Sequence, residues 1–161
     1  MIVVSDTSPI SNLLVIGRLD LLKSVYPAVL VPPIVHTEIL ALRRFFVPLT
    51  DYVQAGWIQR QAPADLIFVS NLHKRLDAGE SEAIALAVEV GAHTLLIDES
   101  KGRQEAADLG LNTVGLLGVL LKAKAIGALP LVKPVLNELI TDADFYVASS
   151  LRQRVLTLAG E

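Results

Sequence analysis

The stretch that decides the fold is IVVSDTSPI, residues 2–10. It opens with three β-branched residues, Ile2, Val3 and Val4, which favour a strand buried inside a parallel sheet. The strand is followed at once by Asp6, and a carboxylate directly behind a buried strand is costly unless something compensates its charge. The sequence therefore raises the question of what Asp6 meets at the end of this strand.

The length and composition of the chain limit the number of domains and the class of protein. The chain has 161 residues, which predicts a single domain spanning 1–161 with a sizeable core. Although 52% of the residues are hydrophobic, no apolar run reaches the roughly 18 residues that a membrane span needs. We expect no membrane partner and, because no basic stretch precedes the first apolar run, no signal peptide. The absence of cysteine favours a cytoplasmic location, and the net charge of −3 gives no general attraction to nucleic acid.

Short apolar runs alternate with patterns of helical spacing along the chain. Strands are expected over 2–5, 28–31, 94–97 and 112–115, with a minor one near 57–60. Helices are expected over 10–26 with a break at Gly17, over 32–46, from Gly79 to Gly91, over 100–110, and two or three more after 116 with an interruption at 127–130. Such alternation predicts an α/β fold with a central parallel sheet covered on both faces.

Three acidic residues are expected at one edge of this sheet. Asp6 and Asp98 each follow a clean β run, and Glu38 lies about two turns into the helix that follows the second strand. In a parallel sheet, polar residues past the carboxyl ends of the strands line the crevice where ligands bind. One such acid alone is more often a helix cap or a turn residue. Three together would repel one another without a cation, so the set predicts a divalent-metal site.

A fourth acid must be chosen from the segment LDAGESEAIALA, residues 76–87. On a helix, Glu80 shares a face with Ala83, Ile84 and Ala87, which we expect to pack against the sheet. Glu82 shares a different face with Leu86 and Glu89, and we interpret Glu82 and Glu89 as solvated charges. Glu80 is therefore preferred to Glu82, although a first-turn acid is also favoured simply by the helix dipole.

These segments together resemble the PIN-domain family. The residues that carry the resemblance are VVSDTSPI, the Glu38 helix after LVPPIV, GESEAIALA, and LLIDESKGRQEAADLGL, in that order between Met1 and about Lys124. The similarity is greatest to the prokaryotic VapC-like ribonucleases of this family.

The resemblance implies a three-layer α/β/α fold in which an acidic cluster holds Mg²⁺ or Mn²⁺ and cuts single-stranded RNA. By position it assigns the catalytic and metal-ligating roles to Asp6, Glu38, Glu80 and Asp98. It also suggests a toxin role beside a small antitoxin protein, and a homodimer. Many relatives carry a further acid where Ser100 stands here; the adjacent Glu99 is expected to point elsewhere.

Other polar residues near the acids have supporting roles in this hypothesis. Thr7 and Ser8 would contact the metal shell or cap the turn ahead of Pro9. Arg103 would contact phosphate or the scaffold, or else pair with an acid such as Glu99. Among the charge pairs, Arg43–Arg44 and Lys74–Arg75 could reach phosphate, although such pairs usually form solvated faces.

The sequence contains few aromatic residues that could stack on nucleic-acid bases. The four aromatic residues considered for this role are more typical of core or interface positions: Phe45, Phe46, Tyr52 and Trp57. None of the three histidines has metal-ligand spacing, and we interpret His36 as structural.

Other enzyme classes fit less well. An aspartyl phosphotransferase would need a second Asp where Ser8 stands, and a dinucleotide enzyme would need a glycine-rich turn that SDTSPI lacks. A receiver domain would need paired acids and a later lysine in a different order. The remaining alternative is a PIN-like fold that has lost catalysis and binds RNA or protein.

Overall fold

A computed structural model describes residues 1–161 of the chain. Its sheet has five strands in the order β3-β2-β1-β4-β5, and every neighbouring pair is parallel. The strands are β1 (Val3–Ser5), β2 (Val29–Val31), β3 (Ile58–Arg60), β4 (Thr94–Leu96) and β5 (Thr113–Val114). The predicted α/β class and parallel sheet are confirmed, and the minor strand expected near 57–60 is β3.

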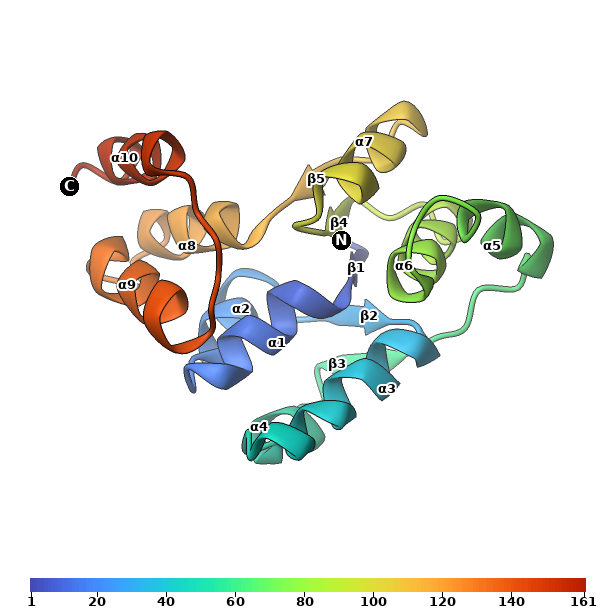
Figure 1. Ribbon diagram of the computed structural model, residues 1–161, viewed down its shortest axis with the longest axis horizontal. Helices are drawn as coiled ribbons and strands as arrows, with labels where there is room; N and C mark the ends of the chain where they lie inside the picture. Colours follow the sequence, from blue (N-terminus) through green and yellow to red (C-terminus); the bar gives the residue numbers. More distant parts are fainter.

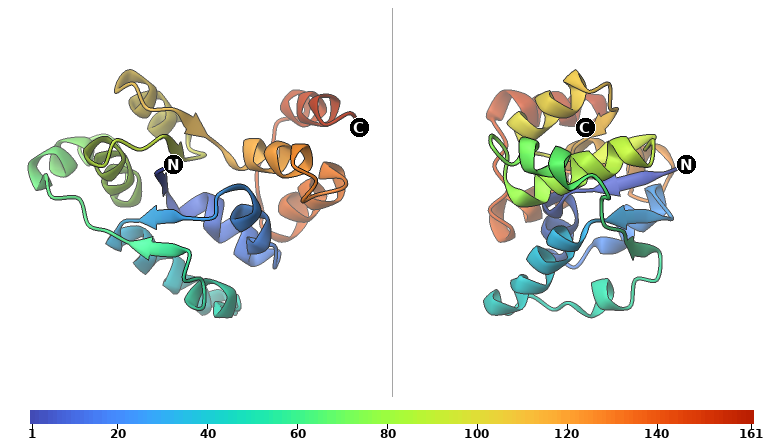
Figure 2. Two further views of the ribbon diagram at one scale, coloured as in Figure 1. Left: turned by 180° about the vertical axis from the view of Figure 1, so that it is seen from behind. Right: turned by 90° about the vertical axis from the view of Figure 1, so that its right-hand side faces the viewer.

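Helices lie on both faces of this sheet, which gives three layers (Figures 1 and 2). In chain order they are α1 (Thr7–Val15), α2 (Leu19–Val25), α3 (Pro33–Leu40), the 3₁₀ helix η1 (Ala41–Phe45), α4 (Thr50–Val53), α5 (Leu66–Leu72), α6 (Ala78–Glu89), α7 (Ser100–Asp108), α8 (Leu116–Ala125), α9 (Val132–Asp142) and α10 (Ser149–Leu158). None of them combines the length and the apolar character that a membrane span requires.

Successive residues of β1 point to opposite faces of the sheet and pack into two separate hydrophobic cores. Val3 belongs to a cluster of 24 buried residues on the face covered by α1, α2, α3, α8, α9 and α10. Val4 joins 11 buried residues on the face covered by α5, α6 and α7. The apolar run that begins α8 contributes Leu116, Val119 and Leu120 to the first core, so much of it is core rather than free surface.

Several predicted boundaries differ from the observed ones. The break at Gly17 is confirmed, because this residue has a φ of 68° that glycine adopts without strain. The helix expected after Gly79 begins instead at Ala78, because the side chain of Asp77 accepts a hydrogen bond from the Glu80 amide and caps the helix. Helices α4 and α5 were not predicted.

The topology places β1 at the centre of the sheet. The chain runs from β1 outward to β2 and β3, and then returns to the other side of β1 to form β4 and β5. Such a reversal of strand order leaves a crevice beyond the carboxyl ends of the two strands where it occurs. The ends of β1 and β4, followed by Asp6 and Asp98, form this point of the fold.

Candidate functional site

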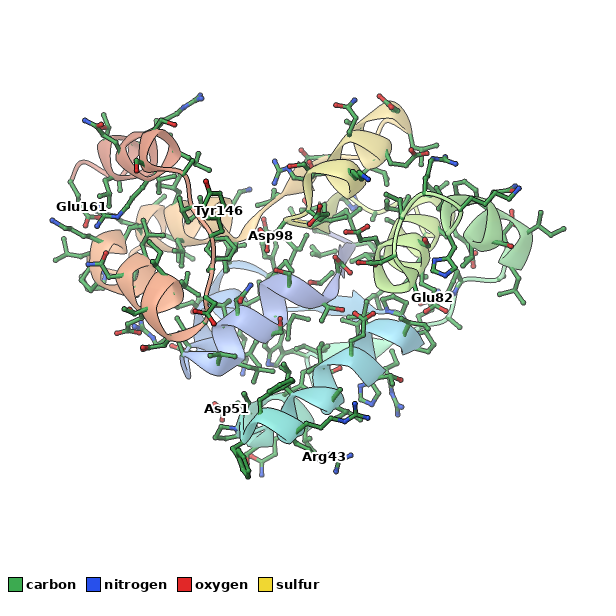
Figure 3. The ribbon with its side chains drawn as sticks, viewed as in Figure 1. Arg43, Asp51, Glu82, Asp98, Tyr146 and Glu161 are labelled. Atoms are coloured by element: carbon green, nitrogen blue, oxygen red, sulfur yellow. The ribbon has the colours of Figure 1, made fainter.

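A cleft of about 1070 Å³ opens where the strand order reverses. It is bounded on one side by the sheet and α6 and on the other by the C-terminal helices, and Figure 3 shows Asp98 between the two. The acidic residues that line this cleft are Asp6, Glu38, Asp77, Glu80, Asp98 and Glu99. The four acids predicted from the sequence thus lie in one cleft, together with two further acids.

Asp6 is one of the two buried acids of the cleft, together with Glu80. It stands at the N-cap position of α1, yet its carboxylate makes no capping hydrogen bond to that helix. Only 6% of the residue is exposed. Burial, together with the charges of Asp77, Glu80 and Glu38, raises the pKa of Asp6 to about 7, while the adjacent Thr7 amide acts in the opposite direction. The carboxylate therefore lies in an environment that favours a compensating positive charge.

Glu38 and Asp6 converge over a glycine of α6. A Cβ atom at Gly79 would lie 2.8 Å from Glu38 Oε2 and 3.3 Å from Asp6 Oδ1. A side chain at this position would push the carboxylates aside, so glycine is what allows α6 to approach them. The Thr7 hydroxyl donates a short hydrogen bond to Glu38 Oε2 and orients that carboxylate.

Glu80 lies at the same end of α6 and is only 4% exposed. Its pKa is raised, mainly by burial and then by the charge of Asp77. Its carboxylate also completes a capping box, because Oε2 accepts a weak hydrogen bond from the Asp77 amide at 3.4 Å. Glu80 thus stabilises the N-terminus of α6 and also faces the other acids.

Glu82 lies outside the cleft, on the side of α6 that faces α3. Its Oε2 accepts a hydrogen bond from the Ile34 amide at 3.1 Å, in the first turn of α3. Glu89, on the same helix, accepts one from the Ala64 amide at 2.8 Å. The interpretation of Glu89 as a solvated charge is confirmed by its exposure, although it also accepts a backbone hydrogen bond. The interpretation of Glu82 as a solvated charge is wrong, because it is half-buried and satisfies a backbone amide at the start of α3.

Asp98 is held by partners on both of its oxygens. Ser8 Oγ donates to Oδ2 at 2.9 Å, and the Leu116 amide donates to Oδ1 at 2.7 Å. Asn12 in turn donates to Ser8 Oγ at 2.9 Å. Burial raises the pKa of Asp98, and these two hydrogen bonds and the charge of Arg103 partly offset the increase. The carboxylate is therefore fixed in orientation.

Arg103 lies beside Asp98 and forms no ion pair with Glu99. Its Nη1 donates to the Ile97 carbonyl at 3.3 Å and would lie 2.6 Å from a Cβ atom at Gly115. The guanidinium thus packs against Gly115 at the edge of the cleft, where it can meet a ligand.

The other basic pairs do not reach the cleft. Arg75 is engaged by the Glu105 carboxylate through its Nε, at 3.0 Å, and its Nη2. Arg43 and Arg44 lie in η1, and Figure 3 shows Arg43 at the far end of the molecule from Asp98. His36, interpreted as structural, has its Nδ1 2.7 Å from the Tyr52 hydroxyl, outside the cleft.

Two acids were missed or misplaced by sequence reasoning. Asp77 lines the cleft and contributes to the raised pKa values of both Asp6 and Glu80. Its capping-box spacing to Glu80 was the signal that could have found it. Glu99 was expected to point away on an extended chain, but α7 begins directly after it, and the turn brings Glu99 to the cleft.

The donors in this cleft fit a hard divalent cation by their chemistry. They are carboxylate oxygens with neighbouring hydroxyls, which Mg²⁺ and Mn²⁺ prefer. Asp6 and Glu38 approach one point above Gly79. No group of three acids or histidines is close enough to form a complete coordination shell as the side chains stand. The residues that would hold an ion are therefore Asp6 and Glu38 first, with Glu80 and Asp77 beside them.

Comparison with known proteins agrees with this architecture. Residues 2–161 match the family described as PIN domain, DUF3368. The chain belongs to the PIN-domain family. Members of this family are commonly nucleases and typically bind divalent metals.

A solved structure shares the fold of this PIN domain. It is a PilT N-terminus domain protein, SSO1118, from the hyperthermophilic archaeon Sulfolobus solfataricus P2, with a TM-score of 0.51. The two sequences are 17% identical over an alignment that covers 74% of this chain and 90% of the other, which supports the fold alone. No curated protein matches the chain by sequence.

Proposed function

We propose that this PIN domain is a divalent-metal-dependent endoribonuclease that cleaves single-stranded RNA. The observation that carries the proposal is that Asp6, Glu38 and Glu80, from three distant segments, line one cleft, where the charges of Glu80 and Glu38 raise the pKa of Asp6. Like charges brought together in this way destabilise a fold unless a cation occupies the site. A bound Mg²⁺ or Mn²⁺ would neutralise charge on a phosphodiester and activate a water molecule for its hydrolysis.

The chain's own residues position the cluster for this chemistry. The Thr7 hydroxyl orients Glu38, while Ser8 and the Leu116 amide fix Asp98. Since both oxygens of Asp98 are hydrogen-bonded, its role in this proposal is to hold Ser8 and the start of α8 in place beside the metal-binding acids. Arg103 supplies a positive charge at the cleft edge for a phosphate oxygen.

The test is cleavage of a broad panel of single-stranded RNAs by the purified chain. We expect cutting with Mg²⁺ or Mn²⁺, none with EDTA, and none from Asp6→Asn under any condition. A matched control is Glu138→Gln, which removes one carboxylate from α9 outside the cleft and should cut like the wild type. Cleavage that persists in EDTA would contradict the proposal.

The second candidate function is an RNA- or protein-binding module without catalysis. It is favoured by the lack of three closely converging ligands and by the hydrogen bonds that occupy Asp98. A preparation that binds Mn²⁺ and RNA but cuts none of the panel would support it. The homodimer and the small antitoxin partner stay predictions of the family resemblance, which sedimentation and co-expression with a neighbouring gene product would test.

A further inference from the structure

One aromatic side chain in the cleft has no partner within the chain. Tyr146 lines the cleft, in the segment between α9 and α10, and is 86% exposed. Figure 3 shows it on the side of the C-terminal helices that faces Asp98. Tyr52 is buried, whereas the exposed Phe45 and Phe46 do not line the cleft. Tyr146 is therefore the exposed aromatic ring beside the acids.

The charges of the cleft are divided between its two sides. The acids come from the sheet edge, α3, the start of α6 and the residue before α7, with Arg103 beside Asp98 on that same side. The basic residues Lys122 and Arg154 come from α8 and α10 on the other side. Arg154 is exposed and forms no ion pair or hydrogen bond within the chain. A polyanion that crosses the cleft would thus meet free positive charge on the wall opposite the carboxylates.

Helix α10, which carries Arg154, is tied to α8 and α9, and the segment that carries Tyr146 is joined to α9 by a hydrogen bond from the Phe145 amide to the Leu139 carbonyl at 3.0 Å. The Glu161 carboxylate accepts hydrogen bonds from Lys124 Nζ at 2.8 Å and from the Val132 amide at 2.7 Å, which ties the end of α10 to α8 and α9. On the face of α10 turned toward α9, Arg152 donates to Asn137 Oδ1 at 2.9 Å. Arg154 is consequently held on the face that borders the cleft.

We propose that Tyr146 and Arg154 form the strand-binding wall of the site. Tyr146 stacks on a base next to the scissile phosphate, and Arg154 contacts a phosphate further along the strand. The inference rests on the proposed function for its substrate class. An exposed ring paired with a free guanidinium fits single-stranded nucleic acid, since every base offers a face for stacking and each nucleotide a phosphate. The exposed Leu151 and Leu158 on the same wall would fit a peptide instead, which is the competing outcome.

The experiment measures binding apart from cleavage. Fluorescein-labelled single-stranded RNA is titrated with the full-length chain carrying Asp6→Asn, alone and combined with Tyr146→Ala, Tyr146→Phe or Arg154→Met. We expect Tyr146→Ala to raise Kd by roughly fivefold to a hundredfold, as loss of one base–aromatic stack does, and Tyr146→Phe to stay within about twofold. Arg154→Met should make the slope of log K against log salt shallower by about 0.7, the value for one phosphate contact on a single strand.

Matched controls lie outside the cleft. Phe45→Ala removes an exposed ring and Arg43→Met an exposed charge from η1, and neither should change Kd or the salt slope. In a set of RNAs with 2-aminopurine at successive positions, the parent protein should quench the fluorescence of one position. The Tyr146→Ala variant should leave that position unquenched.

The outcomes separate the two proposals. If Tyr146→Ala binds RNA as tightly as its parent, or if no RNA binds at all, the proposal that Tyr146 and Arg154 bind an RNA strand is refuted. The surface would then fit a protein ligand instead. If Tyr146→Ala and Arg154→Met weaken binding as expected but the wild-type chain never cuts RNA with Mg²⁺ or Mn²⁺, the wall stands and the nuclease proposal fails. Melting temperatures equal to that of the parent exclude unfolding as the cause.

Discussion

Replacing Asp6 with Asn is expected to raise the melting temperature of the metal-free protein at pH 8 while abolishing RNA cleavage. The carboxylate is 6% exposed and its pKa is raised from 3.8 to about 7. At 1.36 kcal/mol for each tenfold change, keeping it ionised in the folded state costs on the order of 4 kcal/mol relative to the unfolded chain. The Asn amide has nearly the same shape and carries no charge, so it avoids this cost.

The effect has a definite dependence on pH. Below pH 3.8 Asp6 is protonated in the folded and the unfolded chain, and its charge opposes folding in neither. As the pH rises toward 7, the unfolded chain releases this proton while the folded chain retains it, so the wild type loses stability. Above pH 7 the loss is complete. The stability difference between Asp6→Asn and the wild type should therefore be small near pH 4.5 and full at pH 8.

The measurement is thermal unfolding in EDTA at these two pH values. Because the buried Asn amide has a desolvation cost of its own, we expect recovery of about 1–3 kcal/mol of this amount, which would raise the melting temperature by roughly 3–10 °C in a domain of this size. Glu138→Gln, which removes a carboxylate outside the cleft, should shift it far less at either pH. Mn²⁺ should stabilise the wild type more than Asp6→Asn. If Asp6→Asn instead melts several degrees lower in EDTA at pH 8, Asp6 stabilises the fold as a hydrogen-bond acceptor and the reasoning from charge repulsion is refuted.

Three further predictions concern α6. Glu80→Gln should weaken Mn²⁺ binding strongly in a calorimetric titration. Glu82→Gln should change Mn²⁺ binding little, because its side-chain amide oxygen can still accept the hydrogen bond from the Ile34 amide. The reverse order would refute the choice of Glu80 as the metal-binding acid of α6. Gly79→Ala should lower Mn²⁺ affinity, because its Cβ atom would lie 2.8 Å from Glu38 Oε2. The control Gly56→Ala should leave Mn²⁺ affinity unchanged, because the space around Gly56 is open. Equal Mn²⁺ affinities of the two variants would show that the carboxylates can move aside freely. Asp77→Ala should lose about 1 kcal/mol of stability, because the cap of α6 is lost. Asp77→Asn should keep the cap and lose only Mn²⁺ affinity. If Asp77→Asn binds Mn²⁺ normally, Asp77 serves only as the cap of α6.

The sheet could be predicted from the sequence because its strands carry strong local signals. The runs that became β1, β2 and β4 are short, apolar and rich in β-branched residues, and helical patterns separate them. Helix α5 carried no comparable signal. Its Leu66 and Ile67 are 69% and 78% exposed, so the apolar pattern does not mark the face that is buried.

The site was predictable to the level of which segments meet, and less so to the level of single side chains. Asp6 and Asp98 follow from strand ends, a feature that the sequence displays directly. The role of Glu82 depends on the Ile34 amide, 48 positions away in the chain, and no local pattern reports such a contact. Glu99 was misplaced because the start of α7 decides its direction.

The hydrogen bonds divide the acids into two kinds that their sequence positions do not distinguish. Burial raises the pKa of both Asp6 and Asp98. Asp98 has both oxygens hydrogen-bonded, by Ser8 and by the Leu116 amide, whereas Asp6 accepts no capping bond in α1 and only the adjacent Thr7 amide lowers its pKa. A carboxylate with a hydrogen-bond donor on each oxygen has less to gain from a cation than a buried carboxylate with fewer donors. A divalent ion should therefore bind at the Asp6 and Glu38 end of the cleft, while Asp98 holds Ser8 and the start of α8 in place beside it.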